Sequence, residues 1–138
     1  MSTDLYVPDT SAILTLMEDE PGADRVEKIL REGIVILPAM VLLEVYYTSI
    51  QRRSVEVAQK RYAVLKSLPV EHQPELTEPV LIKAGEFKAN HRISLADSII
   101  AAHAAIQDAV LVHKDPEYEA LQMVRQIRLP YKKIANPD

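Results

Sequence analysis

The sequence predicts an α/β fold in which helices cover both faces of a parallel sheet. Short apolar runs occur at residues 5–7, 34–37 and 109–112, and runs of this kind are typical of strands that are buried on both faces. Segments with helical periodicity separate these runs, and such alternation favours parallel pairing of the strands. The fold class that we expect is therefore a three-layer α/β/α sandwich with a central parallel sheet.

Length and composition indicate one globular domain. Of the 138 residues, 48% are hydrophobic, and the mean hydropathy is −0.05. A chain of this length buries roughly two thirds of the surface of its unfolded state, so its core needs neither a disulfide nor a structural metal. We expect one domain over residues 1–138, with an ordered core at about 4–130 and a polar tail at 131–138.

Charge and cysteine content exclude several classes of function. The net charge of −4 argues against a protein that holds nucleic acid by bulk positive charge. The absence of Cys excludes thiol nucleophiles and Cys-ligated zinc, and it fits a cytoplasmic location. No secretory signal is visible at the N-terminus. The longest apolar run, at residues 34–43, is too short to cross a bilayer, so we expect no membrane association.

The first half of the chain is expected to supply two strands and four helices. Pro8 and Pro38 end the strands, because proline cannot donate a hydrogen bond to a strand ladder. Ser54 is a suitable N-cap, and Gly33 stands just past a helix end. In chain order, the expected elements are a strand at 5–7, helices at 12–17 and 23–31, a strand at 34–37, and helices at 39–50 and from Ser54 to about 68.

The second half contains the most informative helix start. Ser94 is a suitable N-cap, and Asp97 follows three residues later, which is a variant of the capping box. The apolar residues that recur at i, i+4, i+7 and i+11 and predict a buried face are Leu95, Ile99, Ala102 and Ile106. The expected elements are a weak strand at 70–72, helices at 79–90 and 94–106, a strand at 109–112, a short helix at 117–125 and an edge strand at 127–129.

Four carboxylates are expected at one edge of the sheet, beyond the carboxyl ends of the strands, where open α/β sheets bind ligands. Asp9 follows the first strand, and Asp115 follows the strand at 109–112. Glu44 lies one to two turns past the second strand, and Asp97 opens the helix that leads to residue 109. Each acid also has a structural explanation: Asp9 and Asp97 suit helix caps, Asp115 suits a turn, and Glu44 suits a surface position.

Together, the four acids favour a metal site. Acids that lie close together repel one another and raise each other's pKa unless a cation holds them. The basic residues nearest to these motifs are Arg92 and Lys114. We therefore expect Mg²⁺ or Mn²⁺, which takes a few carboxylates, keeps waters and supports phosphodiester hydrolysis. The hydroxyl of Thr10 or Ser11 would orient a water molecule or a carboxylate.

The order and spacing of these motifs resemble those of PIN-domain nucleases, of the kind that act as VapC-type toxin ribonucleases in VapBC toxin–antitoxin pairs. The matching segments are residues 7–12, Glu44 in its apolar helix, residues 93–101 and residues 111–118. The resemblance extends from Leu5 to about Leu129. It implies an α/β/α sandwich, Mg²⁺- or Mn²⁺-dependent cleavage of RNA, a homodimer, and a small antitoxin that binds near the active site.

The resemblance also assigns roles to individual residues. The residues that match the acidic cluster and its support are Asp9, Glu44, Asp97 and Asp115, with Ser11, Thr10 and the additional acid Glu117. Two positions depart from the family pattern: His113 replaces a hydroxyl residue, and Tyr118 replaces the more usual Phe. The first departure leaves open the hydrogen bonding around the fourth acid, and Glu117 could take the role of Asp115.

Three alternatives remain open from the sequence. A PIN-like scaffold could bind RNA or protein without cutting, and a PIN nuclease could process RNA as a housekeeping enzyme or act on DNA. Other phosphoryl enzymes fit less well, because a haloacid dehalogenase-like phosphatase needs Asp where Ser11 stands. Gly22, Gly33 and Gly85 are too scattered for a nucleotide-binding loop. His103 is interpreted as a packed helix residue.

Overall fold

In the part of the chain that the structure describes, five short strands form one central parallel sheet. The computed structural model describes residues 4–131, so the predicted tail lies outside the described residues except for Tyr131. The strands are β1 (Leu5–Pro8), β2 (Ile34–Pro38), β3 (Glu71–Gln73), β4 (Val110–His113) and β5 (Gln126–Arg128). Their order is β3-β2-β1-β4-β5, and every neighbouring pair is parallel. The predicted parallel sheet is therefore confirmed.

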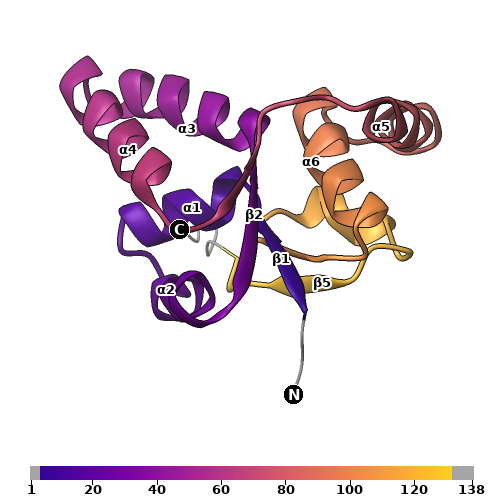
Figure 1. The fold of residues 1–138 in the computed structure, drawn as a ribbon, viewed down its shortest axis with the longest axis horizontal. Helices are drawn as coiled ribbons and strands as arrows, with labels where there is room; N and C mark the ends of the chain where they lie inside the picture. The colour runs from indigo at the N-terminus through magenta and orange to yellow at the C-terminus, as the bar shows by residue number, and fades with distance from the viewer. Residues whose placement is uncertain (1–3, 132–138) are drawn as a thin grey trace, which may run out of the picture.

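Within residues 4–131, six α-helices flank the sheet: α1 (Thr10–Met17), α2 (Ala23–Glu32), α3 (Ala39–Arg52), α4 (Val55–Ser67), α5 (Glu78–Asn90) and α6 (Leu95–Ile106). Alternate side chains of each strand enter different halves of the core. Val7 and Leu111 join the larger cluster with α3, α5 and α6, whereas Tyr6 and Val112 join a smaller cluster with α1 and α2. In Figure 1, the α3–α4 and α5–α6 pairs lie toward the top and α2 lies toward the bottom. This arrangement confirms the predicted α/β/α sandwich.

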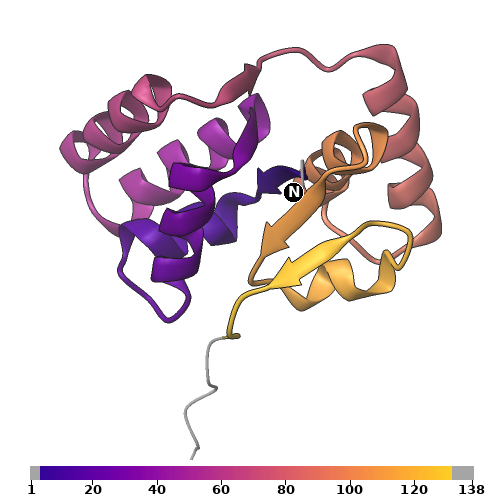
Figure 2. The ribbon, with the colours of Figure 1, turned by 60° about the horizontal axis from the view of Figure 1, so that its bottom comes forward.

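The direction of strand addition reverses at β1. From β1 the chain builds outward through β2 to β3, and it then returns to the other side of β1 with β4 and β5. Figure 2 shows β4 and β5, in orange and yellow, running side by side in the same direction. Open α/β sheets bind ligands at such a switch point, beyond the carboxyl ends of the strands. The segments that follow β1 and β4 are therefore placed to form a site together.

Two sequence-based predictions of local structure were wrong. The predicted buried face of α6 includes Leu95 and Ile106, but these side chains are 63% and 42% exposed, respectively. The buried stretch is instead continuous from Asp97 to Ala104, because α6 packs against α5, α3 and the sheet. The predicted helix at 117–125 is only a 3₁₀ helix, η1 (Pro116–Ala120), because the chain must extend again to enter β5 at Gln126.

Other expectations hold. His103 is packed, as predicted: it is 2% exposed, and its Nδ1 lies 3.0 Å from Oε1 of Gln73. Ser54 caps α4 by accepting a hydrogen bond from the N–H of Val57 at 3.1 Å. Among the described residues, none of the helices combines the length and the apolar character that a membrane crossing requires.

The difference in burial between Leu111 on β4 and Leu95 on α6 gives a stability test. Leu111 is fully buried, whereas Leu95 is 63% exposed. We expect Leu111→Ala to lower the free energy of unfolding by about 2–5 kcal/mol, because it leaves a cavity in the core. The matched change Leu95→Ala is expected to cost no more than about 0.5 kcal/mol. Urea denaturation of both variants measures the difference, and equal losses would contradict this description of the core.

Candidate metal centre

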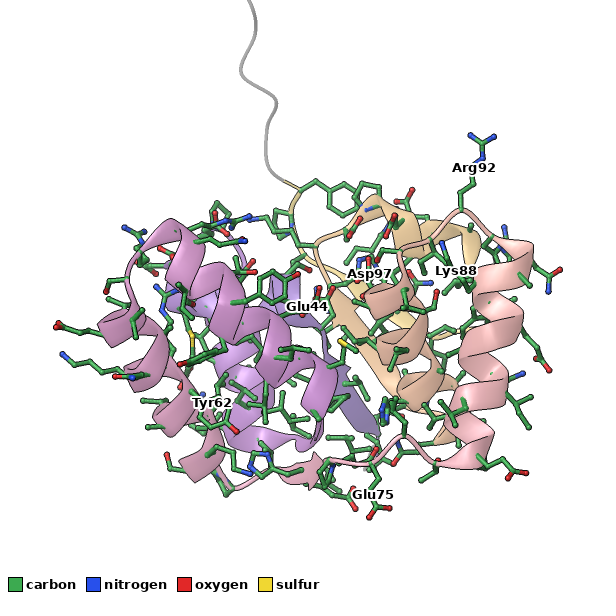
Figure 3. The ribbon with its side chains drawn as sticks, turned by 90° about the horizontal axis from the view of Figure 1, so that it is seen from above. Glu44, Tyr62, Glu75, Lys88, Arg92 and Asp97 are labelled. Carbon is green, nitrogen blue, oxygen red and sulfur yellow. The ribbon has the colours of Figure 1, made fainter. Side chains whose placement is uncertain are left out.

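A cavity of about 640 Å³ lies beyond the carboxyl ends of β1 and β4. The predicted acids and supporting residues all line it: Asp9, Thr10, Ser11, Glu44, Asp97, Asp115 and Glu117. In Figure 3, Glu44 on α3 and Asp97 on α6 lie on the facing sides of these two helices. The fold therefore brings together residues from four separate parts of the chain, as the sequence predicts, and their chemical roles stay predictions.

Asp9 is fixed by the junction between β1 and α1. Its backbone N–H donates to the carbonyl of Val112 on β4 at 3.0 Å. Its carboxylate caps α1 by accepting from the N–H of Ala12 at 2.8 Å, and it also accepts from Oγ of Ser11 at 2.6 Å. Asp9 is only 2% exposed, and burial raises its pKa to about 7 despite these donors. Its role as a helix cap and its place in the cavity are therefore compatible.

Asp97 projects into the cavity because the predicted capping box closes through a different acid. Oγ of Ser94 accepts from the N–H of Asp97 at 3.2 Å, as expected of an N-cap. The N–H of Ser94, however, donates to Oε2 of Glu117 at 3.3 Å, so Glu117 supplies the second half of the box. Asp97 instead accepts from the phenol of Tyr118 at 2.8 Å. Burial raises the pKa of Asp97 well above its ordinary value.

Asp115 and Glu117 complete a cluster with Asp97. Asp115 caps η1, and its carboxylate accepts from the N–H of Glu117 at 2.9 Å. One carboxylate oxygen from each of Asp97, Asp115 and Glu117 lies within 4.8 Å of the others. A hydrogen bond with Asp97 lowers the pKa of Glu117. Because both Asp115 and Glu117 belong to this group, the structure places neither ahead of the other as the fourth acid.

Glu44 lines the same cavity from the second turn of α3. Its Oε1 accepts from Oγ1 of Thr10 at 2.6 Å, and Oε2 lies 3.4 Å from the phenol of Tyr47. The side chain is half-buried, so the surface position that the sequence left open does not describe it. Thr10 and Ser11 thus each donate a hydroxyl hydrogen bond to a carboxylate, Thr10 to Glu44 and Ser11 to Asp9.

His113 replaces the expected hydroxyl residue and still supports the turn before Asp115. Its Nδ1 accepts from the N–H of Asp115 at 3.1 Å. Nε2 must then carry the proton, and it donates to Oε1 of Gln126 at 2.8 Å. The ring is fully buried, and burial lowers the pKa of His113, which keeps it neutral. The sequence left open which group replaces the missing hydroxyl in the hydrogen bonding around Asp115. The structure shows that the imidazole of His113 is the acceptor.

Two cavity features could not be assigned from the sequence. Tyr118 was identified only as an aromatic in place of Phe, but its buried hydroxyl donates to Asp97. Lys114 was noted only as a nearby cation, but it lines the cavity together with Arg52 and Glu20. The sequence contains one signal for each residue: a tyrosine hydroxyl where the family usually has Phe, and a lysine directly before the acid Asp115.

The raised pKa of Asp9 predicts how the stability of the metal-free protein changes with pH. The folded state holds the Asp9 proton up to about pH 7, whereas the unfolded chain releases it near 3.8. The unfolded state therefore binds fewer protons between these values, and stability falls as pH rises through them. We expect Asp9→Asn to remove this contribution, so its free energy of unfolding relative to the wild type increases from pH 4 to pH 7.

Urea denaturation with a chelator across this pH range makes the measurement. Asp24→Asn serves as the matched control, because Asp24 is exposed and lies outside the cavity. A pH-independent difference between Asp9→Asn and the wild type would contradict a raised pKa at Asp9.

The Tyr118 hydroxyl gives a second test. In Tyr118→Phe the ring still packs against His113, whose centroid lies 4.8 Å away, but Asp97 loses its donor. We expect a loss of about 1–3 kcal/mol in the free energy of unfolding of the metal-free protein, because a buried acceptor is left unsatisfied. Tyr62→Phe on exposed α4 is the control and should change little. Equal stability of Tyr118→Phe and the wild type would show that this hydrogen bond contributes nothing.

Three comparisons place the chain among known proteins. The model of the PIN domain family matches residues 6–122. Comparison with curated protein sequences gives no match. Among solved structures, the chain is similar to VapBC2 of Rickettsia felis bound to a promoter DNA fragment, with a TM-score of 0.74 and 17% identity over 91% of this chain and 99% of that chain.

Two further structures show the same fold. VapBC-1 of nontypeable Haemophilus influenzae has a TM-score of 0.71 and 21% identity, covering 90% of this chain and 97% of that chain. VapC20 of Mycobacterium tuberculosis, described as a sarcin–ricin loop cleaving toxin, has a TM-score of 0.67 and 18% identity, covering 88% and 97%. At these identities the structures establish the fold alone. The family model covers most of the sequence, and the protein therefore belongs to the PIN domain family.

Proposed function

We propose that this protein is a divalent-metal-dependent endoribonuclease and the toxin of a toxin–antitoxin pair. The observation that carries the proposal is the convergence of carboxylate oxygens from Asp97, Asp115 and Glu117 within 4.8 Å of one another. Asp9 and Glu44 line the same cavity. With Glu20, six acids line this cavity in the described part of the chain, and such a set is costly for a protein that only binds or packs, because like charges repel.

The donor set fits Mg²⁺ or Mn²⁺. Both ions prefer oxygen ligands, and Mg²⁺ is usually held by one or two carboxylates together with waters and substrate phosphates. Asp97, Asp115 and Glu117 would hold the ion, with Asp9 and Glu44 completing the acidic wall of the cavity. When bound, the ion would activate a water molecule and neutralise charge on the phosphate that is attacked.

The side chains of the protein itself prepare this site. Ser11 and the N–H of Ala12 fix the carboxylate of Asp9, while Thr10 fixes that of Glu44. The phenol of Tyr118 holds Asp97 from the buried side. The proton that burial favours on Asp97 must leave before this carboxylate ligates a cation. Asp9, Glu44 and Asp97 are thus oriented before the substrate arrives, as efficient catalysis requires.

Similarity to VapC proteins supports the toxin role. The similar structures include VapBC complexes, and one is described as a toxin that cleaves the sarcin–ricin loop. By this likeness we infer an RNA substrate, a small antitoxin that covers the cavity, and a homodimer, all in the cytoplasm. A non-catalytic scaffold, a housekeeping RNA-processing nuclease and an enzyme that acts on DNA are the other outcomes of the test.

The test is cleavage of a mixed set of structured RNAs by purified protein with Mn²⁺ or Mg²⁺. We expect Asp97→Asn to reduce the rate by about a hundredfold or more, because it removes a charged ligand that the cluster requires. Asp9→Asn should also be inactive, and excess chelator should stop the wild-type reaction. Retained folding of each variant is checked by its unfolding transition.

Asp24→Asn is the matched control, because Asp24 also lies in the first turn of a helix but on exposed α2. It should cut like the wild type. Equal cutting by the wild type and Asp97→Asn would remove Asp97 from the site, and full activity in chelator would exclude the metal mechanism. Cutting of DNA alone would reassign the substrate. If the wild type cuts none of these RNAs, metal-binding calorimetry separates the two remaining functions: metal binding would favour a toxin with a narrow target, and no metal binding would favour the scaffold.

A further inference from the structure

A buried cation lies in the wall of the acidic cavity. The side chain of Lys114 is only 8% exposed, and it lines the cavity beside Ser11 and Asp115. Lysine is almost never buried without a partner, because its ammonium group loses hydration. The burial of the Lys114 side chain therefore indicates that its ammonium group has a structural or functional role, which a solvated surface lysine does not need.

The ion pair of Lys114 with Glu20 leaves donor capacity unused. Nζ lies 3.5 Å from Oε1 of Glu20, which is longer than the usual range for a hydrogen bond between nitrogen and oxygen. The Glu20 side chain is 27% exposed, and pairs with partly exposed partners are weak. An ammonium group has three N–H donors, so a further anionic acceptor can bind without breaking the structure around it.

The backbone fixes Lys114 relative to the acids. Its N–H donates to Oγ of Ser11 at 2.8 Å, and the same hydroxyl donates to Asp9 at 2.6 Å. The next residue, Asp115, belongs to the acidic cluster. The cavity of about 640 Å³ has the size of a small-molecule site, which is more than one ion needs. There is thus room for a phosphate at Lys114 as well as one at the acids.

We propose that Lys114 forms a phosphate subsite that holds an RNA phosphate next to the one that is cleaved. This inference rests on the proposed nuclease function. Along an RNA strand each phosphate carries a negative charge, and a cavity with six acidic side chains repels every phosphate that lacks a positive partner. A divalent ion held by Asp97, Asp115 and Glu117 would neutralise the phosphate that is cleaved, and the ammonium group of Lys114 neutralises the neighbouring phosphate. Glu20 holds the ammonium group in place until RNA binds.

The experiment measures binding of a labelled, short, mixed-sequence single-stranded RNA as a function of salt concentration. Every variant is made in the Asp97→Asn background, which the proposed function expects to be inactive, so that binding is separated from cleavage. We expect Lys114→Gln to weaken binding about five- to tenfold and to lower the slope of log Kd against log salt by about 0.7, the value for one lost contact on a single strand. Lys114→Arg should keep most of the affinity.

Two further variants distinguish phosphate binding from a structural role. Glu20→Gln removes the competing carboxylate, so it should tighten RNA binding about two- to threefold, whereas a purely structural ion pair predicts unchanged or weaker binding. Lys66→Gln is the matched control, because Lys66 is exposed near the end of α4 and does not line the cavity. It should leave both the affinity and the salt slope unchanged.

The outcomes separate this inference from the proposed function. If Lys114→Gln leaves the RNA affinity and the salt slope of the Asp97→Asn protein unchanged while Asp97→Asn abolishes cleavage, the subsite is overturned and the nuclease stands. If Lys114→Gln unfolds, then weak binding by Lys114→Arg together with no gain from Glu20→Gln overturns the subsite. If the wild-type protein neither binds nor cuts RNA, both proposals fail.

Discussion

The structure depends most on how two buried carboxyl groups, Asp9 and Asp97, are accommodated close to each other. Both are less than a tenth exposed. Burial raises the pKa of both, and the nearby charge of Asp9 raises the pKa of Asp97 further. Each acid lies at a helix N-terminus, where backbone N–H groups and the helix dipole favour negative charge. Hydroxyl donors complete the environment, from Ser11 at Asp9 and from Tyr118 at Asp97. The site is thus held by local hydrogen bonds before any cation binds.

The topology of the sheet makes this arrangement possible. Parallel pairing of β1 with β4 places Pro8 opposite Val112, so the segments after both strands leave the sheet at one edge. A shift of this register by one residue would turn the side chains of β4 to the opposite face. It would also break the hydrogen bond from Asp9 to Val112. The register between β1 and β4 therefore has two consequences: it buries Leu111 in the core, and it brings Asp115 close to Asp9.

The sequence was sufficient for features set by local patterns. Apolar runs ended by Pro8 and Pro38 located two strands, and acids after strand ends located the cavity. It was insufficient where a contact joins distant segments. Glu117 closes the capping box at Ser94, an interaction across 23 residues. The continuous burial of α6 also hides its periodicity, because three neighbours surround that helix. Leu95 was consequently assigned to the core although it is exposed.

Charge distribution explains how a protein with a net charge of −4 can act on RNA. Overall charge gives no attraction, so the proposed RNA binding depends on local positive charge, including the cations within the cavity. Six acids and two basic side chains, Arg52 and Lys114, line it. Without a divalent ion the balance repels phosphate, and protons on Asp9 and Asp97 reduce that repulsion only in part. Exchange of these two protons for one divalent cation would leave the net charge of the cavity unchanged, but it would concentrate the positive charge at the carboxylates, where a phosphate oxygen can also bind. Under the proposed function, RNA binding and metal binding would therefore be coupled through the same carboxylates, and metal binding should strengthen as these acids ionise.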